Sequence, residues 1–257
     1  MSGVRAKKHL GQHFLTDNSV AEKIANVLNL DHTNTVLEVG PGTGVLTRYL
    51  QLRNISDLSV IEIDTESIDY LNKTFPDLRV IEGDFLKYDL ENHSDKPFAV
   101  IGNFPYNISS QIFFKALDNK DKVVELAGMI QKEVAERICA DPGSKTYGIL
   151  SVLLRKYYTL EYLFNVPPTV FRPQPKVNSA VIRMTRNSSD GPDCDEKLLT
   201  RVIKSTFNQR RKMIRNSIKS SFVIGDADHN LLSKRPEQLS LEEFIELTNW
   251  VEEIVKN

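Results

Sequence analysis

The segment TVLEVGPGTG, residues 35–44, joins a run of apolar and β-branched residues to a glycine-rich turn. A continuous run of this kind is typical of a strand buried in a parallel sheet. Gly40, Gly42 and Gly44 allow the backbone to turn sharply and a ligand to approach the main chain closely. Their spacing is G-x-G-x-G, which differs from the G-x-G-x-x-G of dinucleotide-binding proteins. The segment predicts a strand, a turn and a helix, but a glycine-rich turn alone is weak evidence for a ligand.

Further apolar runs follow, and segments with helical periodicity separate them. They are LSVIEID (58–64), RVIEGD (79–84), FAVIGN (98–103) and VVELAGMIQ (123–131). This alternation predicts a parallel sheet covered by helices on both faces. Two later runs, YTLEYLFNV (158–166) and SAVIRMT (179–185), predict a hairpin at the edge of the sheet. Before the first strand, NSVAEKIANVLNL (18–30) predicts a helix capped by Asp17 or Asn18.

The polar segment NSSDGPD (187–193) contains Gly and Pro without periodicity, and it predicts a linker. Only helical patterns follow it. The last helix begins with the capping box Ser240-x-x-Glu243. Its expected apolar stripe consists of Phe244, Thr248, Val251 and Val255. We therefore expect an α/β catalytic domain over residues 1–187 and a small all-helical domain over residues 188–257.

Composition is that of an ordinary globular protein, because 40% of the 257 residues are hydrophobic and 26% are charged. No apolar stretch reaches the length of a bilayer span, and the first residues lack the apolar core of a signal peptide. Cys139 and Cys194 are far apart and match no metal-ligand spacing. We therefore expect a cytoplasmic monomer with no membrane association and no metal site.

The net charge is only −1, but the basic residues are clustered. Arg5, Lys7 and Lys8 lie in a basic N-terminal arm, and a second cluster lies in residues 201–219. The second cluster contains Arg201, Lys204, Arg210, Arg211, Lys212, Arg215 and Lys219. Such clusters predict a surface that binds nucleic-acid phosphates. The alternative is a solvated helix face.

Acidic residues follow two of the predicted strands. Glu62 and Asp64 end the second strand, about 20 residues after the glycine turn, where a carboxylate would meet ribose hydroxyls. Asp84 follows the third strand, and it either accepts a hydrogen bond from an adenine amine or caps the next helix. Because ligands of open α/β sheets bind at the carboxyl ends of the strands, these residues predict a nucleoside-bearing cofactor.

S-adenosyl-L-methionine is the cofactor that fits these features. An NAD enzyme would need a pyrophosphate site and a group for hydride chemistry, and no obvious catalytic His or Tyr/Lys pair is present. S-adenosyl-L-methionine has no pyrophosphate, and its cationic sulfonium suits an acidic edge. A methyl donor is therefore expected.

The segment GNFPYNIS (102–109) follows the fourth strand and predicts the catalytic site. An exocyclic adenine amine is a poor nucleophile. The side-chain oxygen of Asn103 and the carbonyl of Phe104, oriented by Pro105, would accept its two hydrogens and stabilise charge that develops during methyl attack. Tyr106 would stack on the base. The alternative is a turn that ends a buried strand, with the aromatic rings in the core.

Eight segments resemble, in this order, the KsgA-type (RsmA) 16S rRNA adenine N6,N6-dimethyltransferases. They are KKHLGQHFL (7–15), VLEVGPGTGVLT (36–47), IEID (61–64), GDF (83–85), GNFPYNIS (102–109), MIQKEVAERI (129–138), PPTVFRPQPKVNSAV (167–181) and FNQRRKMIRNS (207–217). The resemblance implies a Rossmann-like S-adenosylmethionine-dependent methyltransferase domain with a helical C-terminal domain. It also implies dimethylation of two adjacent adenosines near the 3′ end of 16S rRNA and a role in small-subunit assembly.

The resemblance also assigns site residues. Cofactor contacts fall on His13, Leu15, Gly40, Gly42, Glu62, Ile63, Asp84, Phe85 and Asn103. The base site falls on Asn103, Phe104, Pro105 and Tyr106, with Phe171 as a second stacking aromatic. The chain departs from many relatives at His13, where Asn is common, at Phe104, where Leu is common, and at Asn178, where Asp is common.

Other functions are compatible with parts of the sequence. A 23S rRNA adenine methyltransferase of the Erm resistance type shares the motifs of the first domain, but FNQRRKMIRNS resembles the KsgA type instead. A non-catalytic ribosome-assembly factor would not need the intact NFPY motif and acidic edge. An NAD oxidoreductase is the most distant alternative.

Overall fold

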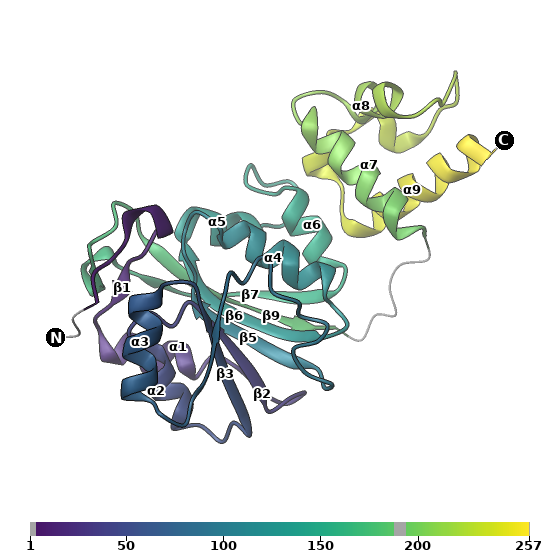
Figure 1. Cartoon of the computed structure of the whole chain (residues 1–257). Helices are drawn as coiled ribbons and strands as arrows, with labels where there is room; N and C mark the ends of the chain where they lie inside the picture. Colours follow the sequence, from purple (N-terminus) through teal and green to yellow (C-terminus); the bar gives the residue numbers. More distant parts are fainter. Residues whose placement is uncertain (1–3, 188–193, 257) are drawn as a thin grey trace. The chain divides into compact units, whose positions relative to one another are not determined.

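The computed structural model describes residues 4–187 and 194–256, and these form two compact units (Figure 1). The first unit comprises Met1–Ala135 and Leu160–Arg186, and the second comprises Glu136–Thr159 and Asn187–Asn257. Residues 136–159 thus group with the second unit, although the sequence-based division placed them in the first domain. Apart from Asn187, the expected linker lies outside the described residues.

A seven-stranded sheet with the order β4-β3-β2-β5-β6-β9-β7 forms the centre of the first unit (Figure 1). Its strands are β2 (Thr35–Val39), β3 (Asp57–Glu62), β4 (Arg79–Glu82), β5 (Phe98–Asn103), β6 (Val123–Gln131), β7 (Tyr158–Val166) and β9 (Ser179–Arg186). Neighbouring strands from β4 to β6 pair in parallel, and β9 pairs antiparallel with β6. The predicted parallel sheet is therefore confirmed, as is the pairing of β7 with β9 at its edge.

Burial explains why the apolar runs become central strands. Every residue of β2 is buried, and in β5 only Asn103 at the end is not. Such strands need apolar cover on both faces. Helices provide it, and those that begin in the first unit are α1 (Asn18–Ala25), α2 (Val45–Gln51), α3 (Thr65–Thr74), α4 (Ser109–Asp118) and α5 (Lys132–Ile138).

The helices pack against the sheet in separate hydrophobic clusters. Ile24 of α1 and Leu50 of α2 pack in one cluster with Val36 and Ile101 of the sheet. Leu71 of α3 packs with Val60 of β3 in another. As expected from sequence, Asp17 caps α1, because its carboxylate accepts from the backbone N–H groups of Ser19 and Val20.

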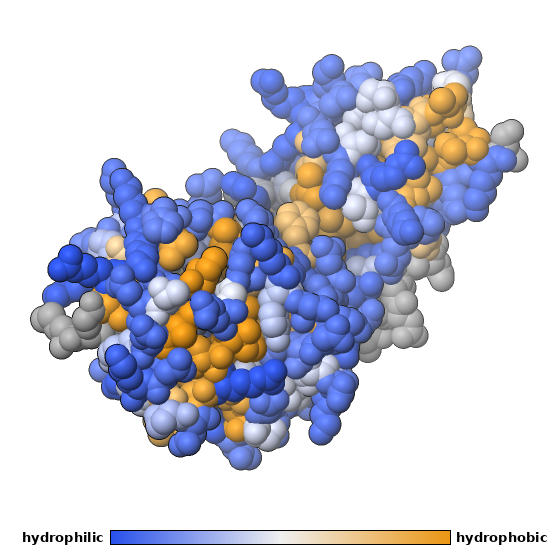
Figure 2. All heavy atoms as spheres, in the orientation of Figure 1, coloured by the Kyte–Doolittle hydropathy of each residue, from blue (hydrophilic) through white to orange (hydrophobic). Residues whose placement is uncertain are grey.

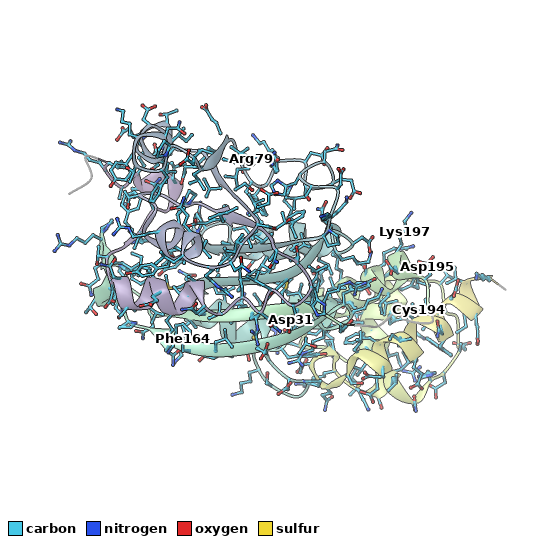
Figure 3. The ribbon with its side chains drawn as sticks, turned by 90° about the horizontal axis from the view of Figure 1, so that it is seen from below. Asp31, Arg79, Phe164, Cys194, Asp195 and Lys197 are labelled. Carbon is cyan, nitrogen blue, oxygen red and sulfur yellow. The ribbon has the colours of Figure 1, made fainter. Side chains whose placement is uncertain are left out.

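A short antiparallel pair, β1 (Phe14–Leu15) with β8 (Phe171–Arg172), lies outside the main sheet. It joins the N-terminal arm to the loop before β9. No local pattern predicts it, because each strand has only two residues. Two 3-10 helices flank these strands, η1 (Lys8–Leu10) and η2 (Pro168–Val170). The ammonium of Lys23 lies 3.8 Å from the ring centroid of Phe164, a residue of the edge strand β7 (Figure 3).

The second unit is helical. Its elements are α6 (Ile149–Arg155), α7 (Glu196–Asn208), α8 (Ile214–Ser221), η3 (Asn230–Ser233), η4 (Pro236–Gln238) and α9 (Leu241–Lys256). Asp195 (Figure 3) caps α7 by accepting from the N–H of Leu198 at 2.6 Å. Phe207 and Phe244 stack in the core with ring centroids 5.9 Å apart.

The capping box expected at α9 is confirmed. The N–H of Ser240 donates to the Glu243 carboxylate at 3.0 Å, and the N–H of Glu243 donates to the Ser240 hydroxyl at 3.2 Å. The expected apolar stripe is wrong at one position. Val251 is fully buried, but Val255 in the last turn of the helix is 57% exposed.

Hydrophilic residues cover most of the face seen in Figure 2, and apolar residues gather in a central area of the first unit. Among the described residues, no helix is long and apolar enough to cross a membrane.

Candidate active site

A cavity of about 200 Å³ lies in the first unit, at the carboxyl ends of β2, β3 and β5. The N-terminal arm, the glycine turn, the ends of these strands and the Asn103–Ile108 loop line it. Every residue assigned to the cofactor lines this cavity: His13, Leu15, Gly40, Gly42, Glu62, Ile63, Asp84, Phe85 and Asn103. The fold thus brings together side chains that the sequence separates by up to 90 residues.

The glycine turn needs its glycines for conformation and for space. Gly40 and Gly42 have φ angles of +66° and +56°, in the left-handed region that other residues rarely adopt. A side chain at Gly42 would place its Cβ 2.8 Å from the ring of Phe14 in the arm. The turn and the arm therefore approach each other as closely as backbone and ring permit.

Glu62 ties the end of β3 to the glycine turn. Glu62 is buried, with 5% of its surface exposed. Its carboxylate accepts hydrogen bonds from three backbone N–H groups. Gly42 donates at 3.0 Å, Ile63 at 2.9 Å and Asp64 at 3.0 Å. Burial raises the pKa of Glu62, and these backbone hydrogen bonds oppose the rise. A carboxylate has about four lone-pair directions, so Glu62 keeps capacity to accept a hydroxyl group.

Glu38 is a second buried acid in the cavity wall, and the sequence analysis did not single it out. It is 1% exposed, and the hydroxyl of Thr47 donates to its carboxylate at 2.6 Å. Burial raises the pKa of Glu38 to about 8, against the lowering effect of the Thr47 hydrogen bond, and nearby Glu62 adds to the rise. Glu38 is therefore mostly protonated at neutral pH. Its one sequence signal was an acid inside an otherwise apolar strand.

Asp84 caps the following turn, which is one of the two roles considered from sequence. One carboxylate oxygen accepts from the N–H of Leu86 at 2.9 Å and so caps the following turn. Its other oxygen has no hydrogen-bond partner in the described part of the chain, and the residue lines the cavity. Beside it, Ile63 is 50% exposed and Phe85 is buried, which gives an apolar setting for a flat ring.

Asn103 is the last residue of β5, and a hydrogen bond from its side-chain amide fixes its position. Its amide nitrogen donates to the backbone carbonyl of His13 at 2.9 Å. This bond assigns the orientation of the amide. The side-chain oxygen then has no hydrogen-bond partner among the described residues, and it remains an acceptor in the cavity wall.

Phe104 lines the cavity, and its ring is buried. The residue is 1% exposed, and its ring packs edge-to-face with Phe113 at 6.2 Å. The paired residues Gly102 and Gly128 form the surface beneath the ring, because a Cβ on either would lie less than 3.0 Å from it. The alternative in which the aromatic ring belongs to the core is thus right for this side chain, while its carbonyl can still act.

Tyr106 is held by two contacts. Its hydroxyl lies 2.6 Å from the hydroxyl of buried Ser179. The imidazole of His13 stacks on its ring, with centroids 5.3 Å apart and planes at 28°. Burial raises the pKa of Tyr106, and the hydrogen bond with Ser179 opposes the rise. Pro105 also lines the cavity.

Phe171, the expected second stacking aromatic, lies in the β1–β8 ribbon. It is 2% exposed, pairs with Leu15 in the β1–β8 ribbon and packs in a hydrophobic cluster. It is not part of the cavity wall. The apolar environment of the ribbon holds the ring in the core, and His13 takes the position beside Tyr106 instead.

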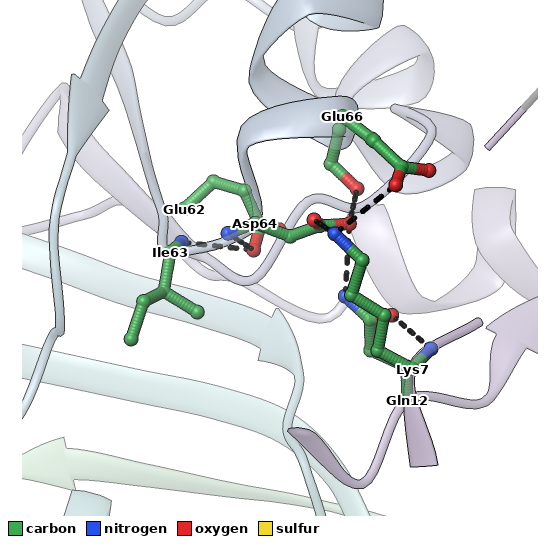
Figure 4. A network of polar contacts seen from close by, with 7 residues as sticks. Lys7, Gln12, Glu62, Ile63, Asp64 and Glu66 are labelled. Carbon is green, nitrogen blue, oxygen red and sulfur yellow. Dashed lines mark hydrogen bonds and ion pairs between the residues drawn. The ribbon is translucent and has the colours of Figure 1, made fainter. Parts of the chain in front are cut away.

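The basic residues assigned to RNA fall into two groups. Arg210 lies 3.9 Å from Glu237, Arg215 pairs with Asp228, and Arg201 lies over the ring of Phe222 at 5.1 Å. Among these residues, the lysines and arginines that are exposed and have no ion pair in the described ranges are Arg5, Lys8, Arg201, Lys204, Arg211 and Lys212. Lys7 differs from its neighbours, because it pairs with Asp64 and with Glu66 (Figure 4).

The structure is similar to solved methyltransferases. It superposes on a dimethyladenosine transferase from Plasmodium falciparum with a TM-score of 0.77 at 23% identity, covering 91% of this chain and 96% of that one. It also superposes on the 23S rRNA methyltransferase ErmE with a TM-score of 0.70 at 26% identity, covering 92% and 99%. The expected Rossmann-like methyltransferase fold with C-terminal helices is therefore confirmed.

The sequence comparisons are more specific. A family model described as "Ribosomal RNA adenine dimethylase" matches residues 3–253. A protein of Parabacteroides distasonis named "Ribosomal RNA small subunit methyltransferase A" is 57% identical over 249 residues, covering 95% of this chain and 93% of the relative. A protein of the same name from Bacteroides thetaiotaomicron is 56% identical over 263 residues, covering 100% and 97%. The chain belongs to the ribosomal RNA adenine dimethylase family.

The contact between Phe104 and Gly128 yields a first test. A Cβ at Gly128 would lie 2.2 Å from the Phe104 ring, so Gly128→Ala should displace the ring and with it the Phe104 carbonyl. Overpacking of this kind costs about 1–3 kcal/mol of stability, and we expect methyl transfer to fall about tenfold or more. Adding Phe104→Leu should restore activity, because the smaller side chain leaves room. Normal activity of the single Gly128→Ala variant would contradict this role.

The buried acid Glu38 yields a pH test. Its pKa is about 8 in the folded chain against an ordinary value of 4.5, so its contribution to stability is complete below the ordinary value and is lost as pH rises through 8. Glu38→Gln removes this titration and keeps an acceptor for Thr47. Relative to wild type, the variant should gain on the order of 2–4 kcal/mol between about pH 5 and about pH 9. Chemical denaturation measures this, and parallel pH profiles would contradict it.

Proposed function

We propose that this chain transfers methyl groups from S-adenosyl-L-methionine to N6 of two adjacent adenosines near the 3′ end of 16S rRNA in the small ribosomal subunit. The product is N6,N6-dimethyladenosine. The observation that carries this proposal is that Asn103, whose side-chain oxygen is left as an acceptor, and Phe104 line the same cavity as the acidic strand ends. The names of the relatives, which refer to the small subunit, support the choice of subunit.

The residues of the cavity fit the proposed cofactor. Glu62 would accept the ribose hydroxyls, since its carboxylate keeps capacity beyond its three backbone bonds. Asp84 would accept from the adenine amine through the oxygen that does not cap the turn. Ile63 and Phe85 provide apolar contacts for the ring. When bound, the cofactor supplies an electrophilic methyl group on a cationic sulfonium.

The chain's own groups prepare the adenine amine for attack. Its nitrogen lone pair is delocalised into the ring, so charge builds on nitrogen as the bond to the methyl carbon forms. In the first transfer the Asn103 oxygen and the Phe104 carbonyl would accept the two amine hydrogens and stabilise this charge. One proton then leaves to solvent, so a single hydrogen remains on the amine for the second transfer. Preorganised groups of this type contribute roughly 3 kcal/mol each to the transition state.

Tyr106 would hold the target base in the cavity. The base must leave its stack to reach the site. Stacking on an aromatic side chain stabilises an unstacked base by about 1–3 kcal/mol. In the described structure His13 covers the Tyr106 ring, so the base would stack there together with the imidazole or in its place.

Exposed lysine and arginine side chains would bind the RNA backbone. Lys204, Arg211 and Lys212 in the second unit are exposed, as are Arg5 and Lys8 in the first. Contacts between such cations and phosphates make binding weaker as salt increases.

Two other functions make different demands. An Erm-type enzyme would methylate large-subunit RNA, and the similarity to ErmE means that the fold alone does not separate the two. A purely structural assembly factor would bind the subunit without transferring methyl groups. The relatives' names favour the small-subunit enzyme, which can also act during assembly.

Methyl transfer to isolated ribosomal subunits tests the proposal. The purified chain is incubated with labelled S-adenosyl-L-methionine and with small subunits that lack the modification, and large subunits serve as the parallel substrate. We expect label in small-subunit RNA and N6,N6-dimethyladenosine in its nucleoside digest. Label in large-subunit RNA alone would favour the Erm-type function, and binding without label would favour the assembly factor.

A further inference from the structure

The N-terminal arm, defined here as Lys7–Leu15, forms one wall of the active-site cavity. Residues 9–15 of the arm line the cavity directly. Its start is joined to the end of β3, and its end is joined to the catalytic loop and to β8. The arm therefore connects the cofactor side of the cavity with the base side.

The start of the arm is attached through one buried carboxylate. The side chain of Asp64 has no exposed surface, and it accepts from the ammonium of Lys7, from Gln12 at 3.4 Å and from Ser67 at 2.9 Å (Figure 4). The backbone N–H of Lys7 also donates to the side chain of Gln12 at 2.7 Å. Asp64 lies two residues after Glu62, so the arm is attached directly beside the expected ribose site.

The end of the arm is attached to the catalytic loop. The carbonyl of His13 accepts the Asn103 amide at 2.9 Å, and the His13 imidazole stacks on Tyr106. The next two residues of the arm pair with β8. Between the two attachments, Gly11 turns with a φ of +66°, and a Cβ there would lie 2.5 Å from the Asn107 side chain. The arm thus lies close against the loop that carries Asn103.

We propose that Lys7, Gln12 and Asp64 form a latch that fixes the arm across the cavity and thereby positions Asn103 through the carbonyl of His13. Lys7 and Asp64 are then positioning residues for methyl transfer. Lys7 then does not contact phosphate, although its place in the basic arm predicts such a contact. This inference rests on the proposed function, but the attachment of the arm can be measured without it.

Electrostatics favour a closed latch at neutral pH. Burial would raise the pKa of Asp64, but hydrogen bonds from Lys7, Ser67 and Gln12 outweigh it and hold the pKa below its ordinary value. The hydrogen bond with Asp64 in turn raises the pKa of Lys7 against the effect of its own desolvation. Both groups stay charged well on either side of neutrality. Lys7→Met would leave the buried Asp64 carboxylate without its cationic partner, and Asp64→Asn would remove the carboxylate that holds Lys7, so either change favours release of the arm.

Lys8 provides a matched control within the same arm. It is adjacent to Lys7 and carries the same charge, but it is exposed and has no carboxylate partner in the described ranges. If the two lysines serve only as a basic patch, their removal should have equal effects. If Lys7 belongs to the latch, Lys7→Met and Lys8→Met should differ in kind.

The experiment compares wild type, Lys7→Met and Lys8→Met in the full chain. For Lys7→Met we expect faster amide hydrogen exchange in residues 7–15, a roughly tenfold weaker Kd for S-adenosylhomocysteine and a similar loss of turnover. The salt dependence of small-subunit binding should stay unchanged. For Lys8→Met we expect normal exchange, a normal Kd and a salt slope reduced by about one.

A double variant separates the latch from two independent roles. Asp64→Asn should also speed exchange in the arm. Lys7→Met with Asp64→Asn should be no worse than Lys7→Met alone, because no unpaired buried charge remains. If the losses caused by the two single substitutions multiply in the double variant, Lys7 and Asp64 act independently and the latch is overturned.

The outcomes distinguish the latch from the proposed function. Unchanged exchange in the arm of both Lys7→Met and Asp64→Asn overturns the latch, even if the wild-type chain methylates small subunits as proposed. Faster exchange in these variants supports the attachment, even if the wild-type chain transfers no methyl group. Identical effects of Lys7→Met and Lys8→Met on the salt slope would return Lys7 to the phosphate-binding residues.

Discussion

The hydrogen bond from the Asn103 amide to the carbonyl of His13 is the contact on which the site depends. An asparagine side chain can donate on one side and accept on the other. By occupying the donor, His13 leaves the oxygen as an acceptor in the cavity. The Phe104 carbonyl follows directly in the chain, and its ring is fixed over Gly102 and Gly128. Two consecutive residues of the cavity wall therefore each have an acceptor, the side chain of Asn103 and the backbone of Phe104.

The second constraint is the gathering of carboxylates at the carboxyl edge of the sheet. Each is satisfied differently: Glu62 by three backbone N–H groups, Asp64 by the arm, Asp84 by the following turn, and Glu38 by Thr47 and protonation. Fixed carboxylates cost less to maintain than free ones in a partly buried position. The remaining acceptor capacity suits a cationic ligand with ribose hydroxyls. The carboxyl ends of the strands therefore provide the polar groups of the site.

Much of the fold could be predicted from sequence, because apolar runs and capping residues act locally. The parallel strands, the caps of α1 and α9 and the cofactor-side residues of the cavity follow from such patterns or from the family resemblance. The missed features depend on contacts between distant segments. The pairing of Lys7 with Asp64, the burial of Phe171 in the β1–β8 ribbon and the stacking of His13 on Tyr106 have no local signal. Glu38 was overlooked because the strand around it looked like ordinary core.

The central claim is that Asn103 acts in the chemical step, and the single-turnover rate of Asn103→Ala tests it most directly. The rate is measured with saturating S-adenosyl-L-methionine and unmodified small subunits, and the Kd for S-adenosylhomocysteine is measured in parallel. We expect the rate to fall about 100-fold or more, as for the loss of one preorganised polar group, while the Kd weakens by no more than about tenfold, the loss expected when the arm is released. A rate within about threefold of wild type would contradict the proposed role of the side chain.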